Sequence, residues 1–322
     1  MLAALSLLEK NFIPACLIAI AAGLAWPAPG LKAAFLLTLV LVLILFFTAL
    51  RVDFSAVRGH LEKPLALSLS VFLLMFVFPL AFYAVSRAII PRYSLGLLVM
   101  AAMPAGMAST ALAVACGGEG AMALAVTLLT SLAAPLSVPL LVNLSGEAPP
   151  GEISARMLTM LRQSIMLAAT LLLPMAAAYV LKKYRPELVR RHRTAYGGLA
   201  IAALALLIWI AMSIGAQTVF SDKTSSIVLL LYLFGYSGAF HLLGYFMLPH
   251  IPARRRIALS VNTAYVNNAL AIVFAREFFP DRPEVMLPAV LLELPMTVAL
   301  LPLKFLAAKF FAGTDTASGD VP

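Results

Sequence analysis

The chain has 322 residues, of which 63% are hydrophobic and only 11% are charged, and its formal net charge is +9. Soluble domains carry about 25% charged residues, so this composition excludes a soluble protein with a water-facing surface of normal size. The basic residues lie in short segments between apolar runs, which argues against a nucleic-acid partner and for a protein surrounded by membrane lipid.

Apolar runs of about 20 residues recur along the chain, and this is the length that a helix needs to cross the hydrocarbon core. The sequence lacks the alternation of apolar and polar residues that is typical of a membrane barrel. We therefore predict an all-α integral membrane protein with ten transmembrane helices, at residues 12–28, 31–50, 64–86, 94–116, 121–144, 157–181, 197–216, 226–249, 257–279 and 286–310.

The first predicted span is short and follows Lys10, so a signal peptide cleaved near residues 25–28 is an alternative. We favour a transmembrane helix, because nine spans would spoil the repeat described below. Most Lys and Arg residues lie at the termini and in the even-numbered connections. The positive-inside rule therefore predicts a multi-pass protein of the inner (plasma) membrane with both termini cytoplasmic.

The two halves of the chain share a short pattern. Ser109-Thr110-Ala-Leu in the fourth span resembles Asn267-Asn268-Ala-Leu in the ninth. Five spans per half is an odd number, so the second half must be inverted relative to the first, as in many secondary transporters. We predict two inverted repeats, residues 1–156 and 157–322.

Polar residues inside lipid are costly unless they have partners, so their positions carry information. In the fourth span, Pro104 and Gly106 weaken the helix, and freed carbonyls beside hydroxyls can form a cation site. The ninth span is densely polar but contains no Gly or Pro, so a break there is less clearly indicated. Hydrogen bonding between helices is the alternative for both segments.

Glu293 is the one carboxylate well inside a predicted span, about 10 Å deep by helical rise. One interpretation is a proton- or cation-coupling group; the alternative is a structural acid held by hydroxyls or an arginine. His241 is a weaker candidate for a proton relay, with a satisfied structural histidine as its alternative.

Three segments resemble the bile acid:sodium symporter family, in its bacterial form, and the resemblance covers nearly the whole chain. Residues 104–110 (Pro-Ala-Gly-Met-Ala-Ser-Thr) resemble the family's broken fourth helix, Pro-Gly-Gly-Thr-Ala-Ser-Asn. Residues 267–270 resemble part of its broken ninth helix, and residues 48–54 look like the segment that closes its second span. The resemblance implies a core domain (spans three to five and eight to ten) and a panel domain, with interrupted helices four and nine crossing.

The function that this resemblance implies is secondary transport of a small organic anion by alternating access, usually with sodium. Carried over residue by residue, the substrate-binding candidates are Asn267, Asn268, Met107 and Ser109. The ion-coupling candidates are Ser109, Thr110, Thr127 and Asn262, to which we add Glu293, which is not a family ligand.

The sequence departs from the family at both sodium sites. At the first, only Ser109 and Thr127 match, as weak sodium ligands, while Thr110, Ala123 and Asn262 replace an asparagine, a hydroxyl and the acidic ligand. At the second, Leu74 and Val266 stand where glutamines are expected. We therefore expect the sodium sites to be partly lost, with coupling by protonation of Glu293 or no coupling as alternatives, and no cofactor other than sodium.

A membrane-embedded enzyme is the remote alternative. It would need a nucleophile with a base, or a metal cluster. The intramembrane ionisable residues singled out here are only Glu293 and His241, and Cys16 and Cys116 lie in apolar stretches without metal-ligand spacing. We predict no catalytic residues.

Overall fold

The computed structural model describes residues 5, 7–8, 11–52, 64–146 and 153–311. The segment with Asp53 and Phe54, part of the resemblance at residues 48–54, lies outside them. Within the described residues the chain is helical and contains no β-strand beyond one isolated bridge pair. Helices are expected in lipid because every backbone polar group must be satisfied inside the segment that crosses it.

The described residues contain five helices that are long and apolar enough to cross a membrane: Leu65–Ile89, Gly120–Leu144, Ile153–Tyr184, Arg193–Ser221 and Lys223–Phe246. Two shorter apolar helices, Phe12–Ala25 and Ala34–Ala49, lie near the N-terminus. Large apolar side chains such as Leu65, Leu136 and Ile153 are at least 75% exposed, as expected for side chains that face lipid. An all-helical, multi-pass membrane protein is therefore confirmed.

The elements of the first half begin with α2 (Phe12–Ala25) and the short α3 (Pro27–Lys32). The others follow in chain order: η1 (Ala34–Leu36), α4 (Leu37–Ala49), α5 (Pro64–Phe72), the π-helical turn η3 (Leu73–Val77), α6 (Phe78–Ile89), η4 (Pro91–Tyr93), α7 (Ser94–Ala101), α8 (Ser109–Ala115) and α9 (Gly120–Leu144).

The elements of the second half begin with α10 (Ile153–Tyr184) and the short α11 (Pro186–Arg191). The others are α12 (Arg193–Ser221), α13 (Lys223–Phe246), α14 (Ala253–Ala264), α15 (Asn268–Phe278) and α16 (Pro283–Phe311).

Several predicted boundaries were wrong. Residues 27–32, predicted as the end of one span, a two-residue connection and the start of the next span, form the separate helix α3. It begins at Pro27 because proline suits the first turn of a helix. The helix predicted at 157–181 extends in both directions, to Ile153 and Tyr184. In contrast, the spans predicted at 94–116 and 257–279 are each two helices separated by non-helical residues, as the resemblance implied for helices four and nine.

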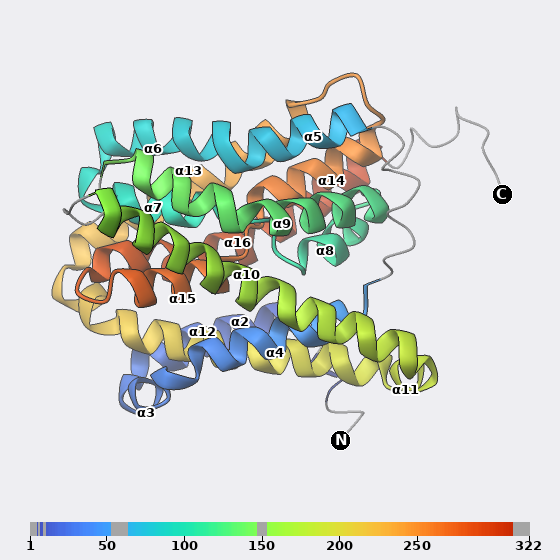
Figure 1. The fold of residues 1–322 in the computed structure, drawn as a ribbon, viewed down its shortest axis with the longest axis horizontal. Helices are drawn as coiled ribbons and strands as arrows, with labels where there is room; N and C mark the ends of the chain where they lie inside the picture. The colour runs from blue at the N-terminus through green and yellow to red at the C-terminus, as the bar shows by residue number, and fades with distance from the viewer. Residues whose placement is uncertain (1–4, 6, 9–10, 53–63, 147–152, 312–322) are drawn as a thin grey trace.

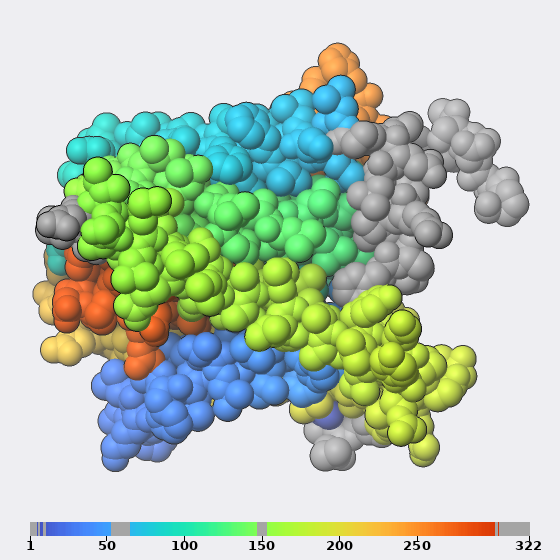
Figure 2. Space-filling view, in the orientation of Figure 1, coloured from blue at the N-terminus to red at the C-terminus, as the bar shows by residue number. Residues whose placement is uncertain are grey.

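The helices form two groups, which meet through α10 and through the packing of α2 and α12 on α16 (Figure 1). In one group, α2 and α4 pack on α12; in the other, α13 packs on α14 and α16, and α7 packs on α16. The α10 helix contacts both α4 and α9, and the space-filling view shows it lying across the junction between them (Figure 2). The two broken helices, α7–α8 and α14–α15, belong to the second group.

Candidate functional site

The two helix breaks meet and hydrogen-bond to each other. The N–H of Gly106 donates to the carbonyl of Tyr265 at 2.8 Å, and the N–H of Asn267 donates to the carbonyl of Pro104 at 2.7 Å. Ala105 and Val266 form the antiparallel bridge between these bonds. Backbone groups that the breaks release are thus paired with each other, so non-helical backbone becomes tolerable inside the membrane.

Two residues, Gly106 and Thr130, allow the two breaks to approach closely and satisfy their backbone groups. A Cβ atom at Gly106 would lie 3.2 Å from the Val266 carbonyl oxygen, so glycine suits the close approach of the two chains. The buried hydroxyl of Thr130 on α9 accepts a hydrogen bond from the Ala105 N–H at 3.2 Å. Thr130 was not among the predicted site residues, and nothing in its local sequence distinguishes it from other threonines of that helix.

Three of the predicted ion-coupling residues form one buried cluster: Ser109 on α8, Thr127 on α9 and Asn262 on α14. The Asn262 Nδ2 atom donates to the Thr127 hydroxyl and to the Ala123 carbonyl, both at 2.9 Å. The Ser109 and Thr127 hydroxyl oxygens are 3.1 Å apart. The cluster therefore links three helices through polar groups.

Thr110 and Met107 are not hydrogen-bonded members of this cluster. The Thr110 hydroxyl is buried and has no hydrogen-bond partner in the described part of the chain. Met107 is also buried and belongs to the main apolar core.

Asn267 and Asn268 begin α15 and differ in their contacts. The Asn267 Oδ1 atom accepts from the Leu270 N–H at 3.2 Å and so caps the helix. The Asn268 Nδ2 atom donates to Glu293 Oε1 at 3.0 Å and also to the Ala289 carbonyl. The structure thus brings Glu293, buried on α16, to the start of the second broken helix.

His241 lies with Ser260. The Ser260 hydroxyl donates to the His241 backbone carbonyl at 2.8 Å, so its oxygen accepts from His241 Nδ1, 3.0 Å away. The His241 ring also packs edge-on against Tyr265. The other ring nitrogen, Nε2, is buried without a hydrogen-bond partner in the described residues, so only one side of the imidazole is satisfied by its neighbours.

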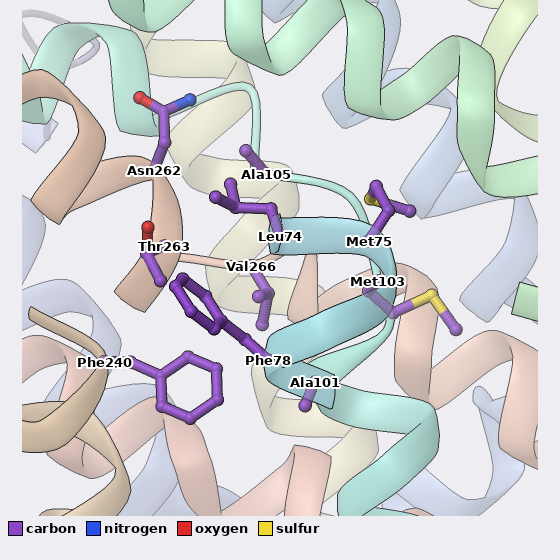
Figure 3. A pocket seen from close by; sticks show the side chains of 10 residues that line it. All are labelled: Leu74, Met75, Phe78, Ala101, Met103, Ala105, Phe240, Asn262, Thr263 and Val266. Atoms are coloured by element: carbon purple, nitrogen blue, oxygen red, sulfur yellow. The ribbon is translucent and has the colours of Figure 1, made fainter. Parts of the chain in front are cut away.

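A small cavity of about 10 Å³, the size of one water molecule, lies beside the crossing. Leu74 and Val266 line it together, with Asn262 at one end and Phe78 and Phe240 at the other (Figure 3). Apart from Asn262 and Thr263, its described walls are apolar side chains and alanines. The described residues contain no group of three or more His, Cys, Asp or Glu side chains that is able to hold a metal ion.

No curated protein compared with the chain matches it. A model of the sodium bile acid symporter family matches residues 38–222, just over half of the chain, from α4 to the residue that follows α12. The matched region includes Ser109 and Thr127, whereas Asn262, Asn267 and Glu293 lie beyond it. The resemblance read from residues 104–110 is thereby confirmed, and the chain belongs to the sodium bile acid symporter family.

Proposed function

We propose that this protein is a secondary transporter that moves a small organic anion across the inner membrane by alternating access. The observation that carries the proposal is the crossing of two broken helices, at Pro104–Gly106 and Tyr265–Asn267, in a chain of a solute-transporter family. Broken helices near the middle of the membrane are where secondary transporters place their substrate sites.

The proposal includes the architecture that alternating access needs. The ten spans form two inverted repeats, 1–156 and 157–322, and the group with α7–α8 and α14–α15 acts as a core that moves against a panel made of α2, α4, α10 and α12. Panel and core meet where the Arg276 guanidinium on α15 donates to the Ala34 carbonyl of η1.

Asn267 is the residue that we assign to substrate contact, with Asn268, Met107 and Ser109 around it. Asn267 lies at the crossing and at the N-terminus of α15, where the helix dipole places partial positive charge. This polarity supports an anionic substrate.

Uptake into proteoliposomes tests the proposal. The substrates are radiolabelled taurocholate and a series of small mono- and dicarboxylates, and protein-free liposomes are the control. We expect saturable uptake of at least one anion and accelerated exchange when the same anion is preloaded. If no compound shows saturable uptake or exchange, organic-anion transport is excluded.

Proton coupling through Glu293 is the second candidate, favoured by the position of that carboxyl group. It is buried and bonded to Asn268, and its helix, α16, packs on α2 of the panel. Glu293 therefore lies where α16 faces the panel, so movement of the core can alter its access to water.

The test of this coupling is Glu293→Gln, which keeps the size and hydrogen-bonding capacity of the side chain but cannot exchange a proton. We expect an inward pH gradient to accelerate uptake by the unsubstituted protein and not by the variant. Equal acceleration of both proteins would reject coupling at Glu293. An absence of acceleration in both, with uptake intact, would support facilitated diffusion.

A further inference from the structure

The family implies sodium as the coupling ion. A cation could bind at the cluster of Ser109, Thr127 and Asn262 only if its oxygen atoms had lone pairs that are not used in hydrogen bonds. The Thr127 hydroxyl has one hydrogen, and it donates that hydrogen to the Ala123 carbonyl at 2.9 Å. In its contact with Thr127, Ser109 must therefore be the donor. The Thr127 oxygen accepts from Ser109 and from Asn262, which uses both of its lone pairs.

The Ala123 carbonyl is also fully used, since it accepts from both Thr127 and Asn262. A carbonyl oxygen can only accept, so the part of the Asn262 amide that faces it must be the NH₂ group. The positive end of the amide dipole therefore lies among the oxygens that would have to surround a cation.

The oxygens that remain are few and neutral. Asn262 Oδ1 and the Thr110 hydroxyl are buried without a hydrogen-bond partner in the described residues. No carboxylate of the described chain is hydrogen-bonded to the cluster. A hard cation requires several oxygen ligands, and a buried one is stabilised by negative charge.

The second sodium site expected from the family offers even fewer oxygen ligands. Leu74 and Val266, which replace glutamines there, line the same cavity of about 10 Å³ with Met75, Phe78 and Phe240. Apart from Asn262 and Thr263, the walls of this cavity are apolar and cannot replace the hydration shell of an ion, so transfer of sodium into it is unfavourable.

We propose that the Asn262 amide permanently takes the place of a sodium ion at the first position, and that apolar side chains fill the second, so that the protein transports without sodium. This rests on the proposed function and specifies its coupling. The amide bonds α14 to α9 directly, and to α8 through Ser109, as an ion shared by the same oxygens would. The crossing is thus held together in every ionic condition.

Thermal unfolding of the purified protein in detergent tests the binding claim without a substrate. The protein is titrated with sodium chloride, potassium chloride or choline chloride at equal ionic strength. A ligand that binds only the folded form raises the midpoint by mass action. We expect the three salts to give the same midpoint; a saturable rise that is specific to sodium would overturn the proposal.

The substitution Asn262→Asp tests the role of the amide. A carboxylate there would face the Ala123 carbonyl and the Thr127 oxygen with no hydrogen between them, a repulsion that a cation would relieve. We expect a lower midpoint than the unsubstituted protein in choline chloride and a saturable, sodium-specific rise.

The matched control is Asn267→Asp, the same chemical change at the crossing. There a carboxylate can still cap α15 through the Leu270 N–H, so we expect no sodium-specific rise. A folded Asn262→Asp protein without a sodium response would overturn the assignment of the amide. The titration of the unsubstituted protein needs no variant and decides the sodium claim even if Asn262→Asp does not fold.

Exchange of anion in proteoliposomes then separates this inference from the proposed function. Exchange that continues at an unchanged rate when choline replaces sodium on both sides supports both. Exchange that requires sodium overturns the inference and leaves the transporter proposal standing. Absence of exchange in all salts, with no sodium effect on unfolding, rejects the proposed function and leaves the absence of sodium binding intact.

Discussion

Thr130 stabilises the crossing although it belongs to neither broken helix. Its hydroxyl is fully buried and accepts a hydrogen bond from the Ala105 N–H, which lies in the break and outside any helix. Thr130→Val should leave that N–H without a partner, at a cost of about 1–3 kcal/mol. We expect a thermal midpoint lower by several degrees, and Thr130→Ser, which keeps the hydroxyl, should restore most of it. Equal midpoints for the two variants would show that this bond does not stabilise the crossing.

Asp222, which lies between α12 and α13 outside the spanning segments, links pH to stability. The hydroxyl and N–H of Ser225 and the Arg92 guanidinium, 2.5 Å away, hold the pKa of the Asp222 carboxyl below its ordinary value of 3.8. A group with a lowered pKa in the folded state stabilises that state above its ordinary pKa, and the contribution is lost as pH falls through the lowered value.

We therefore expect Asp222→Asn to lower the thermal midpoint at neutral pH, although asparagine can still cap α13. The difference from the unsubstituted protein should shrink as the pH is lowered below about 4, and added salt should reduce it at neutral pH. The measurement is the midpoint of both proteins across a pH series. A difference that is constant from neutral to acidic pH would exclude this linkage.

At the scale of elements, close packing of α7 on α16 depends on one glycine. A Cβ atom at Gly96 would lie 2.5 Å from the Val285 carbonyl oxygen, which belongs to backbone and cannot move aside alone. Gly96→Ala should destabilise the protein by about 1–3 kcal/mol through overpacking.

The control for this prediction is Gly235→Ala in α13, where a Cβ would meet nothing within 4 Å. There alanine should be neutral or stabilising, by up to about 1 kcal/mol, because it favours the helix. The thermal midpoints of the two variants test whether the packing of α7 on α16 requires a glycine. A Gly96→Ala protein as stable as Gly235→Ala would show that α7 and α16 can separate without loss of stability.

The positions of the helices follow from the sequence more directly than their interruptions do. Long apolar runs predict helices in lipid because burial of the backbone leaves few alternatives. The break at Pro104–Gly106 carries a local signal, since proline removes a donor. The break at Tyr265–Asn267 does not, because its backbone is paired by Pro104 and Gly106, more than 150 residues away.

In the site, too, the identity of the residues could be predicted from the sequence, whereas contacts that depend on tertiary packing could not. Resemblance to the family grouped Ser109, Thr127 and Asn262, and the structure brings them together. The direction of the amide was not predictable, because it depends on the Ala123 carbonyl and the Thr127 oxygen both standing as acceptors beside Asn262. The common cavity of Leu74 and Val266 likewise results from packing between distant segments.

For the whole molecule, orientation in the membrane is the property that the transport direction depends on. Glu187 on α11 and Thr224 at the start of α13 are exposed and lie on either side of α12. That helix has 29 residues and a length of about 43 Å, enough to separate the two faces of the bilayer. Arg190 and Arg191 lie on the same short helix as Glu187, so the positive-inside rule predicts a cytoplasmic Glu187.

Cysteines introduced singly at these two positions test the orientation with a membrane-impermeant maleimide. Background should be low, because Cys16 and Cys116 are only 1% and 3% exposed. In intact cells we expect labelling of Thr224→Cys and protection of Glu187→Cys, with the reverse in inside-out vesicles. Labelling of Glu187→Cys in intact cells, with Thr224→Cys protected, would show that the orientation is the opposite of the predicted one. The pH gradient that we propose to drive uptake through Glu293 would then have to be applied from the opposite side.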